Sequence, residues 1–386
     1  MHSPLTRFLL AGFWIALVAA NPDLYGAAVA APEISAVQGS ILNGNTIKVG
    51  GNGFGHHGPT VAVFDDFEKG SDGKVTAIGP GSAQVGTWDT IADILVPKYS
   101  NAFAHSGSLS NMSDWSDHGA HEGGRWIGKM LPGGVTDIYF SWWAYVPVNR
   151  AIPGANTPWG PNWKLFWIYH HPWPASDYVF TLMTDSLPVG NPPRADYFLM
   201  AAADDRNAPM RANFDTRYGP STFIKGRWNR WEVYMKGSTS NGTLQAWEMN
   251  GGVKRTQIAS RNGVVTIHAG ELWDNLHFPG YGRGDKNSQT YYDDIYVATG
   301  PGAMARVEIG NAAKYTECTN LAVITPTFWS DTTIEATVRQ GSFRVGEAAF
   351  IFVLDVNGTP NTRGYPIFIG HRVGLPTSPN AVPEKP

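Results

Sequence analysis

The segment from Trp163 to Trp173 gathers more aromatic and titratable side chains than any other part of the chain. It includes His170 and His171, and an imidazole can act as a base near neutral pH. If residues 163–171 form a strand, alternate side chains share a face and both faces are mixed. The pattern predicts a reactive strand but does not decide which of its faces lines a groove. Ordinary solvated histidines at a strand end are the alternative interpretation.

Aromatic rings are concentrated in the same part of the chain. Thirteen of the 15 tryptophans lie between Trp88 and Trp273. The apolar face of a sugar can stack on such rings while an indole N–H or a phenol O–H bonds its hydroxyl groups. Packing in a large core is the alternative use of each ring. The residues that we expect to bind carbohydrate are Tyr139, Trp143, Tyr145, Trp163, Trp167, Tyr169 and Trp173.

Short strands joined by turns must position these side chains. Apolar side chains alternate with a second set over residues 138–146, and the same period of two recurs over residues 333–338. This alternation is typical of half-buried strands. Turn signals such as Asn241-Gly242 and Asn357-Gly358 recur at short intervals. No amphipathic helix longer than two turns is evident, so the sequence predicts an all-β fold of the sandwich type.

The composition excludes several classes of protein. Cys318 is the only cysteine, so the chain can form neither an internal disulfide nor a cysteine-ligated zinc or iron–sulfur site. The formal net charge is −3, which argues against a nucleic-acid partner because such proteins carry a basic surface. Charged residues make up 16% of the chain, against about 25% on average, which disfavours a long solvated helical array.

Residues 1–30 are predicted to be a signal peptide. Residues 8–20 form an apolar run of 13 residues, which is the length of a signal-peptide core and too short to span a bilayer. Small-residue cleavage sites end at Ala20 and at Ala30, and the second is preferred because it directly precedes the first predicted strand. We expect a secreted or periplasmic bacterial protein whose mature chain has no membrane span; a noncleaved anchor is the alternative.

The two ends of the chain resemble each other in character and differ from the middle. The turn at residues 50–55 reads G-G-N-G-F-G, and residues 329–334 read W-S-D-T-T-I. These phrases resemble successive parts of the IPT/TIG family of immunoglobulin-like domains. The resemblance implies a smaller Ig-like sandwich built from residues 31–64 and 301–370, with the intervening residues inserted and residues 371–386 as a disordered tail. Three sequential units are the alternative.

The insert, residues 65–300, resembles the concanavalin A-like jelly rolls of the laminin-G, glucanase and polysaccharide-lyase type. This resemblance implies a large β-sandwich, and the fold hosts lectins, hydrolases and lyases alike. The phrases that carry it, in the order of that family, are residues 64–70, 105–109, 137–147, 226–234, 241–247 and 291–297.

Both kinds of catalysis known for this fold need particular side chains. Glycoside hydrolysis needs two carboxylates about 5–9.5 Å apart, and the E-x-D-x-x-E phrase of the glucanases is missing. A β-elimination needs a group that neutralises a uronate carboxylate and a base that removes the neighbouring carbon-bound proton. The R-x-E-x-R and Q-I-H phrases of alginate lyases are also missing. If the chain is a lyase, the candidate catalytic residues are His170, His171, Arg217, Tyr281 and Arg283.

A structural calcium ion is a further expectation. Asp66 and Glu68 lie near the start of the insert and Asp294 lies near its end. In jelly rolls of this type the first and last strands usually pair, so these carboxylates are expected to converge. Oxygen ligands of this kind suit Ca²⁺. Hydrogen bonds from the carboxylates to loop backbone are the alternative.

Together these features favour a secreted protein that binds a polysaccharide in an aromatic groove of the jelly roll. A polysaccharide lyase is the first alternative, and a non-catalytic structural or adhesive surface protein is the second. The sequence does not identify the polysaccharide, the oligomeric state or the organism.

Overall fold

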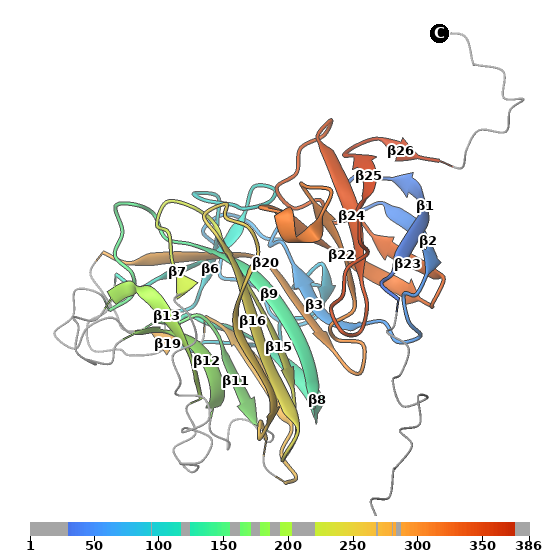
Figure 1. Ribbon diagram of the computed structural model, residues 1–386. Helices are drawn as coiled ribbons and strands as arrows, with labels where there is room; N and C mark the ends of the chain where they lie inside the picture. Colours follow the sequence, from blue (N-terminus) through green and yellow to red (C-terminus); the bar gives the residue numbers. More distant parts are fainter. Residues whose placement is uncertain are drawn as a thin grey trace, which may run out of the picture. The chain divides into compact units, whose positions relative to one another are not determined.

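The protein is described by a computed structural model (Figure 1), which covers residues 30–93, 95–116, 124–154, 163–170, 178–185, 194–202, 221–267, 269–279, 281–282 and 287–374. The predicted signal peptide, apart from Ala30, lies outside these residues. Within them the only helical element is a short 3-10 helix, η2 (Tyr315–Glu317), so the fold is all-β as predicted. No helix among the described residues has the length and apolar character needed to cross a membrane.

Two antiparallel sheets form the larger part of the molecule. In the first, here called the front sheet, the strand order is β14-β13-β12-β11-β18-β8-β5, with β10 and β19 beside this path. Its strands are β5 (Thr90–Ile91), β8 (Ile127–Val135), β10 (Trp163–Lys164), β11 (Trp167–His170), β12 (Tyr178–Asp185), β13 (Arg194–Ala202), β14 (Ser221–Thr222), β18 (Trp273–Phe278) and β19 (Tyr281–Gly282).

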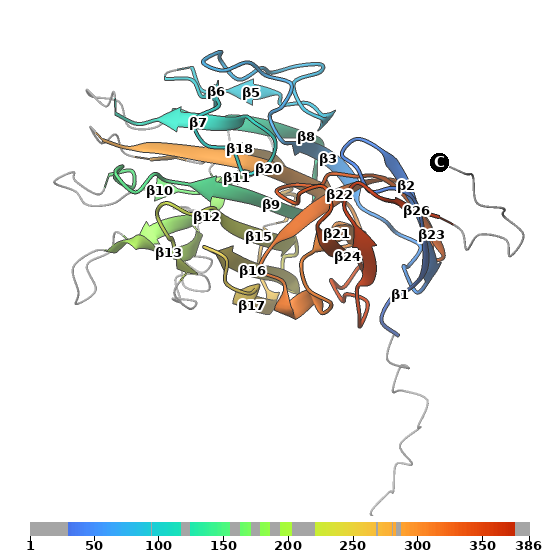
Figure 2. The same ribbon diagram turned by 90° about the horizontal axis from the view of Figure 1, so that it is seen from above.

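The second sheet, here called the back sheet, has the order β17-β16-β15-β9-β20-β3-β4, and β6 and β7 extend it beside β20. Figure 2 shows β20, β9, β15, β16 and β17 side by side in this order. Its strands are β3 (Thr60–Asp65), β4 (Val85–Gly86), β6 (Lys98–Ser100), β7 (Ser110–Asp114), β9 (Asp137–Tyr145), β15 (Asn229–Lys236), β16 (Gly242–Asn250), β17 (Thr256–Val264) and β20 (Gln289–Thr299).

The core of this large sandwich lies between the two sheets, because each sheet turns alternate side chains inward. Phe140 and Trp142 of β9 contribute from the back sheet, and Leu276 and Phe278 of β18 contribute from the front sheet. The rings of Phe140 and Phe278 meet edge to face with centroids 5.9 Å apart. Each large buried ring contributes about 2–3 kcal/mol through removal of apolar surface from water. Many of the aromatic side chains therefore pack the core of the large sandwich. This was the alternative interpretation to sugar binding.

Strands from both ends of the chain form a third sheet, which encloses an apolar core of its own and is here called the terminal sandwich. Its order is β25-β24-β21-β22-β23-β2-β1-β26, and Figure 1 shows β1 and β2 in blue beside the orange and red strands. One apolar core, which includes Val49 of β2 and Val353 of β24, fills it. Its strands are β1 (Glu33–Ser40), β2 (Thr46–Asn52), β21 (Arg306–Gly310), β22 (Leu321–Trp329), β23 (Thr333–Thr337), β24 (Ala348–Leu354), β25 (Tyr365–Phe368) and β26 (Arg372–Val373).

Two predicted boundaries differ from the structure. The expected boundary after residue 64 falls inside β3, which pairs with β20 of the back sheet through Asp65 and Ile295. The expected tail from residue 371 begins too early, because Arg372 and Val373 pair with β1. Both differences arise because strand pairing is a long-range property that local composition does not show. The resemblance to the IPT/TIG family stays a prediction.

The outer face of the back sheet packs against the terminal sandwich. Tyr139 of β9 shares an apolar cluster with Val323 of β22, and Trp143 shares another with Leu321. Ion pairs cross the same interface: Arg230 of β15 donates to Glu308 of β21 at 2.5 Å. The outer face of the front sheet lies on the opposite side of the core, away from these contacts.

Candidate functional site

His277 lies at the centre of a ring cluster on the outer face of the front sheet. Its neighbours in β18, Leu276 and Phe278, point into the core, so His277 and Asn275 point outward. The indole of Trp126 stacks on the imidazole with ring centroids 3.7 Å apart and planes 5° apart. The imidazole is buried, with only 2% of the residue exposed.

The neighbouring strand β11 brings two more rings to this face. In the sheet Trp167 pairs with His277 and Tyr169 pairs with Asn275. The Tyr169 ring lies 4.8 Å from the imidazole, and Trp167 meets Tyr169 edge to face at 5.9 Å. Trp126, Trp167 and Tyr169 are each partly exposed. The cluster thus offers three accessible aromatic rings around a buried imidazole.

Lys164 adds a positive charge to the edge of the cluster. Its ammonium group lies 5.9 Å from the centre of the Trp167 ring. Lys164 of β10 pairs with Tyr281 of β19. The backbone of Tyr281, a predicted catalytic residue, therefore lies on the neighbouring strand. Lys164, Trp167 and Tyr169 belong to the segment that the sequence identified as reactive.

Burial determines the electrostatics of the two outward-facing residues of β18. Loss of hydration lowers the pKa of His277 to about 3, so its imidazole is neutral at pH 7. Asn275 is fully buried, and within the described part of the chain neither its Oδ1 nor its Nδ2 has a hydrogen-bond partner. A buried amide without partners costs about 1–3 kcal/mol, so the Asn275 amide is a group to which a water or ligand could hydrogen-bond.

Four of the seven predicted carbohydrate-binding residues lie elsewhere. Tyr139 is fully buried and its hydroxyl donates to Glu232 at 2.9 Å. Trp143 is 5% exposed and its ring stacks on His105 at 3.8 Å. Both point to the outer face of the back sheet, where the terminal sandwich covers them, so neither ring is accessible to a sugar. The expectation of a groove along this face of β9 is therefore corrected.

Tyr145 and Trp163 are the other two. Tyr145 is partly exposed, but its ring stacks on Phe103 at 4.6 Å on the back sheet, away from His277. Trp163 is fully buried in the core and meets Phe223 edge to face at 5.5 Å. It therefore packs the core and does not line a groove.

The remaining predicted residues fall partly or wholly outside the description. His171, Trp173, Arg217 and Arg283 lie outside the described residues. For His170 and Tyr281 only the backbone is described: His170 pairs with Trp273, and Tyr281 with Lys164. Their predicted roles stay predictions.

The sequence reading missed Trp126, Asn275 and His277. The only signal for the last two was their spacing, since an amide and an imidazole two residues apart share one face of a strand. Trp126 joins them through the pairing of β8 with β18, which places Gly128 opposite His277. Nothing local in the sequence indicates that pairing.

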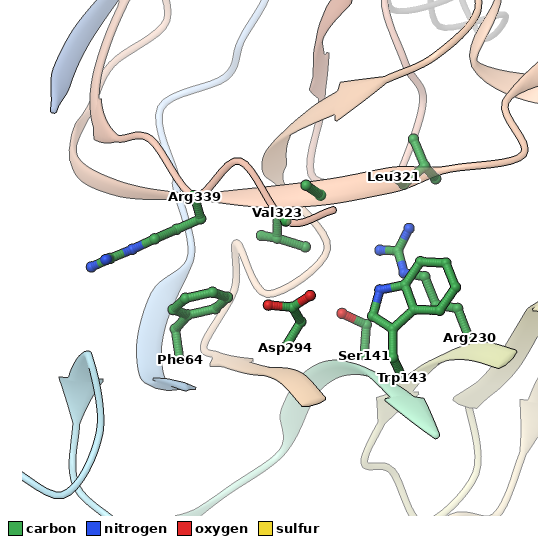
Figure 3. A pocket seen from close by; sticks show the side chains of 10 residues that line it. Phe64, Ser141, Trp143, Arg230, Asp294, Leu321, Val323 and Arg339 are labelled. Carbon is green, nitrogen blue, oxygen red and sulfur yellow. The ribbon is translucent and has the colours of Figure 1, made fainter. Parts of the chain in front are cut away.

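The three predicted metal ligands do meet. Asp66, Glu68 and Asp294 line one cavity of about 150 Å³ together with Arg339. Figure 3 shows the adjoining pocket, in which Asp294 lies between Phe64 and Ser141, and Val323 of β22 forms the opposite wall.

Hydrogen bonds from protein groups already use these carboxylates. Glu68 accepts from the backbone of Ser108 and Leu109 at 2.7 and 2.6 Å. Asp294 accepts from the ring of His105 at 2.6 Å and from the hydroxyl of Ser106 at 2.7 Å. No group of three or more metal-binding side chains forms among the described residues. Protein donors thus already bond oxygen atoms of Glu68 and Asp294 that a calcium ion would use, and the expected calcium site stays a prediction.

Comparison with known proteins gives likenesses of fold only. No protein-family model and no curated protein matches the chain. Among solved structures, an endo-β-1,4-glucuronan lyase from the fungus Trichoderma reesei is 10% identical, with a TM-score of 0.42, over 60% of this chain and 96% of that one. A GH131 β-glucanase catalytic domain from Podospora anserina is 11% identical, with a TM-score of 0.41, over 62% and 96%.

An alginate lyase from Chlorella virus is 13% identical, with a TM-score of 0.35, and the match covers 55% of this chain and 93% of that one. These neighbours are jelly-roll proteins that act on polysaccharides. At such low identities and TM-scores they say nothing about the activity of this chain, which has to be inferred from its own residues.

Proposed function

We propose that this chain binds a polysaccharide on the outer face of the front sheet. The observation that carries the proposal is the set of partly exposed rings, Trp126, Trp167 and Tyr169, around the buried His277. Sugar rings stack on aromatic faces, and the polar edges of tryptophan and tyrosine bond sugar hydroxyls. Export, as the leader-like residues 1–30 predict, would place this face where polysaccharides occur.

Binding is tested by affinity electrophoresis against a panel of neutral and uronic polysaccharides. We expect at least one of them to retard the protein. Trp167→Ala and Tyr169→Ala should each weaken binding about tenfold, since a lost ring contact is worth about 1 kcal/mol or more. Phe328→Ala is the matched control, because Phe328 is an exposed ring (52%) on β22 of the terminal sandwich. If no polysaccharide retards the protein, the proposal is rejected.

A β-elimination at the same face is the second candidate, and the grouping of His277, Tyr169 and Asn275 favours it. The imidazole of His277, whose pKa of about 3 a bound uronate carboxylate would raise, would take the proton from the carbon next to that carboxyl. The C–H electrons then form a carbon–carbon double bond as the glycosidic C–O bond breaks. The Tyr169 hydroxyl would protonate the leaving oxygen, and the unpartnered amide of Asn275 would donate to the carboxylate.

The two candidates are separated by following the absorbance of unsaturated chain ends. A lyase should release such ends from a uronic polymer, and His277→Ala or Tyr169→Phe should reduce the rate by about 10²-fold or more. Retained binding by His277→Ala, together with lost turnover, would assign the imidazole to chemistry. If no uronic polymer yields new ends, elimination is rejected and binding alone stands.

A further inference from the structure

The imidazole of His277 is closely surrounded by other groups. Trp126 covers one face of the ring almost in parallel, at 3.7 Å between centroids and 5° between planes. The residue opposite His277 in the sheet is Gly128. A Cβ atom at Gly128 would lie 2.8 Å from Cδ2 of His277 and 2.3 Å from Oγ1 of Thr90. Glycine is needed here for space, because any side chain would displace the ring.

The packing of Trp126 and Gly128 around the imidazole restricts how a ligand can reach it. Both nitrogens and their proton or lone pair lie in the ring plane. With one face under Trp126 and the Cδ2–Nε2 edge against Gly128, the ring is held with its opposite edge turned away from β8. A sugar that stacks on Trp167 or Tyr169 would therefore meet the edge of the imidazole and not its face.

We propose that Trp126 and Gly128 are positioning residues for His277, which fix its ring plane and keep water from its covered face. The inference rests on the proposed function of the front sheet. Neither residue needs to touch the reacting atoms: Trp126 acts through the stacked ring and Gly128 acts through the room that it leaves.

The described groups around the imidazole come from the strands beside β18 and from β5. From β11, Tyr169 is the titratable group that faces the imidazole, at 4.8 Å between ring centroids. From β10, the ammonium group of Lys164 lies 5.9 Å from the centre of the Trp167 ring. Trp126, directly before β8, Gly128 of β8 and Thr90 of β5 are uncharged. Loss of hydration is accordingly what lowers the pKa of His277 to about 3.

The test is an NMR titration of the His277 ring protons, assigned by their loss in His277→Gln. In Trp126→Leu we expect water to reach the uncovered face, so the pKa of His277 should rise from about 3 toward the ordinary value of about 6.5. Trp126→Phe, which keeps a flat ring, should stay close to the wild type. Gly128→Ala keeps Trp126 but should also raise the pKa of His277, because the added methyl group displaces the imidazole from its buried position.

Trp167→Leu is the matched control: it removes a ring from the same face but not the one stacked on the imidazole. It should weaken glycan binding and leave the His277 titration unchanged. The titration needs no ligand, so it is informative even if no polysaccharide binds. If folded Trp126→Leu and Gly128→Ala both titrate like the wild type, the positioning role is wrong. If glycan binding is present, it should become pH-dependent near pH 5–6 only in these two variants, and a pH-independent profile in both would also contradict the proposal.

Discussion

Asp65 at the end of β3 is buried, and burial outweighs the favourable charge of Lys69 nearby. It is 0% exposed, and its carboxylate accepts from the indole N–H of Trp88 at 2.7 Å and from the backbone of Phe67 at 3.0 Å. Burial outweighs these bonds and raises its pKa from 3.8 to about 8. The folded protein thus holds a proton that the unfolded chain releases above about pH 4.

The free energy of unfolding should therefore fall as the pH rises from about 4 to 8. The raised pKa contributes stability that is complete below the unfolded value and is lost as the pH passes the folded one. We expect urea unfolding of the wild type to show a loss of roughly 2–4 kcal/mol between pH 5 and pH 8. Asp65→Asn should make this dependence shallower, the remainder coming from Asp66 and Asp293, whose pKa burial also raises. Asp93→Asn, at an exposed site, should leave it unchanged. An equally steep decline in Asp65→Asn would show that other groups cause it.

Single residues were predictable where the sequence is locally dense. Trp167 and Tyr169 were predicted to bind sugar because the segment around them is rich in rings. The structure places both near His277, and their binding role stays a prediction. His277 itself was missed because it stands alone in the sequence and gains its neighbours only through strand pairing. Tyr139 was misplaced for a related reason: alternation separates two faces of a strand but does not show what covers each.

At the scale of elements, the loop of residues 105–109 depends on carboxylates from three distant positions. Glu68 accepts from Ser108 and Leu109, and Asp293 accepts from the backbone of His105 at 2.7 Å. Asp294 bonds the His105 ring and Ser106. The loop is therefore held by direct hydrogen bonds to Glu68, three residues after β3, and to Asp293 and Asp294 of β20.

We accordingly expect EGTA to leave the unfolding temperature unchanged. Glu68→Gln should lower the free energy of unfolding by about 1–2 kcal/mol, since its bonds to backbone N–H groups weaken without the charge. Glu347→Gln is the control, because Glu347 also accepts from a backbone N–H, that of Arg344, but at an exposed turn. A fall in unfolding temperature with EGTA that added calcium reverses would restore the predicted ion.

Strand positions were predictable to a greater extent than strand partners. The expected strand over residues 138–146 matches β9 (Asp137–Tyr145) to within one residue at each end. Its periodicity comes from the chain itself, so it is visible locally. The pairing of β2 with β23, in which Ile47 meets Ala336, joins residues nearly three hundred positions apart. Here only the resemblance of the two ends suggested a shared sandwich. That resemblance did not show that β3 pairs with the back sheet.

At the scale of the molecule, buried charges join the large sandwich to the terminal sandwich. Glu308 of β21 accepts from Arg230 of β15 at 2.5 Å and from Arg306 at 3.2 Å. Glu232 of β15 accepts from Arg306 at 3.2 Å and from Arg255 at 2.9 Å. Nearby guanidinium groups hold the pKa of both carboxyls below the usual range, although burial alone would raise it. Their contribution to stability is present above about pH 4.5 and is lost as the pH falls below it.

This network predicts that the two sandwiches unfold together. Glu308→Gln leaves the buried guanidinium groups of Arg230 and Arg306 without their counter-charge, which should cost about 3 kcal/mol or more. Calorimetry should show one transition in the wild type and a lower, still single, transition in the variant. The Lys254–Glu317 pair is the control, because both of its side chains are about half exposed and Glu317→Gln should leave the transition in place.

Two separate transitions in the wild type would contradict this coupling, as would a Glu308→Gln variant no less stable than Glu317→Gln. The distinction matters for the proposed site, because a terminal sandwich fixed on the back sheet covers the aromatic face of β9 permanently. The rings around His277 on the front sheet then remain the proposed binding face. If the sandwiches instead separate at low cost, Trp143 becomes accessible, and glycan binding should then rise in Glu308→Gln. We expect its affinity for glycan to equal that of the wild type below the unfolding transition.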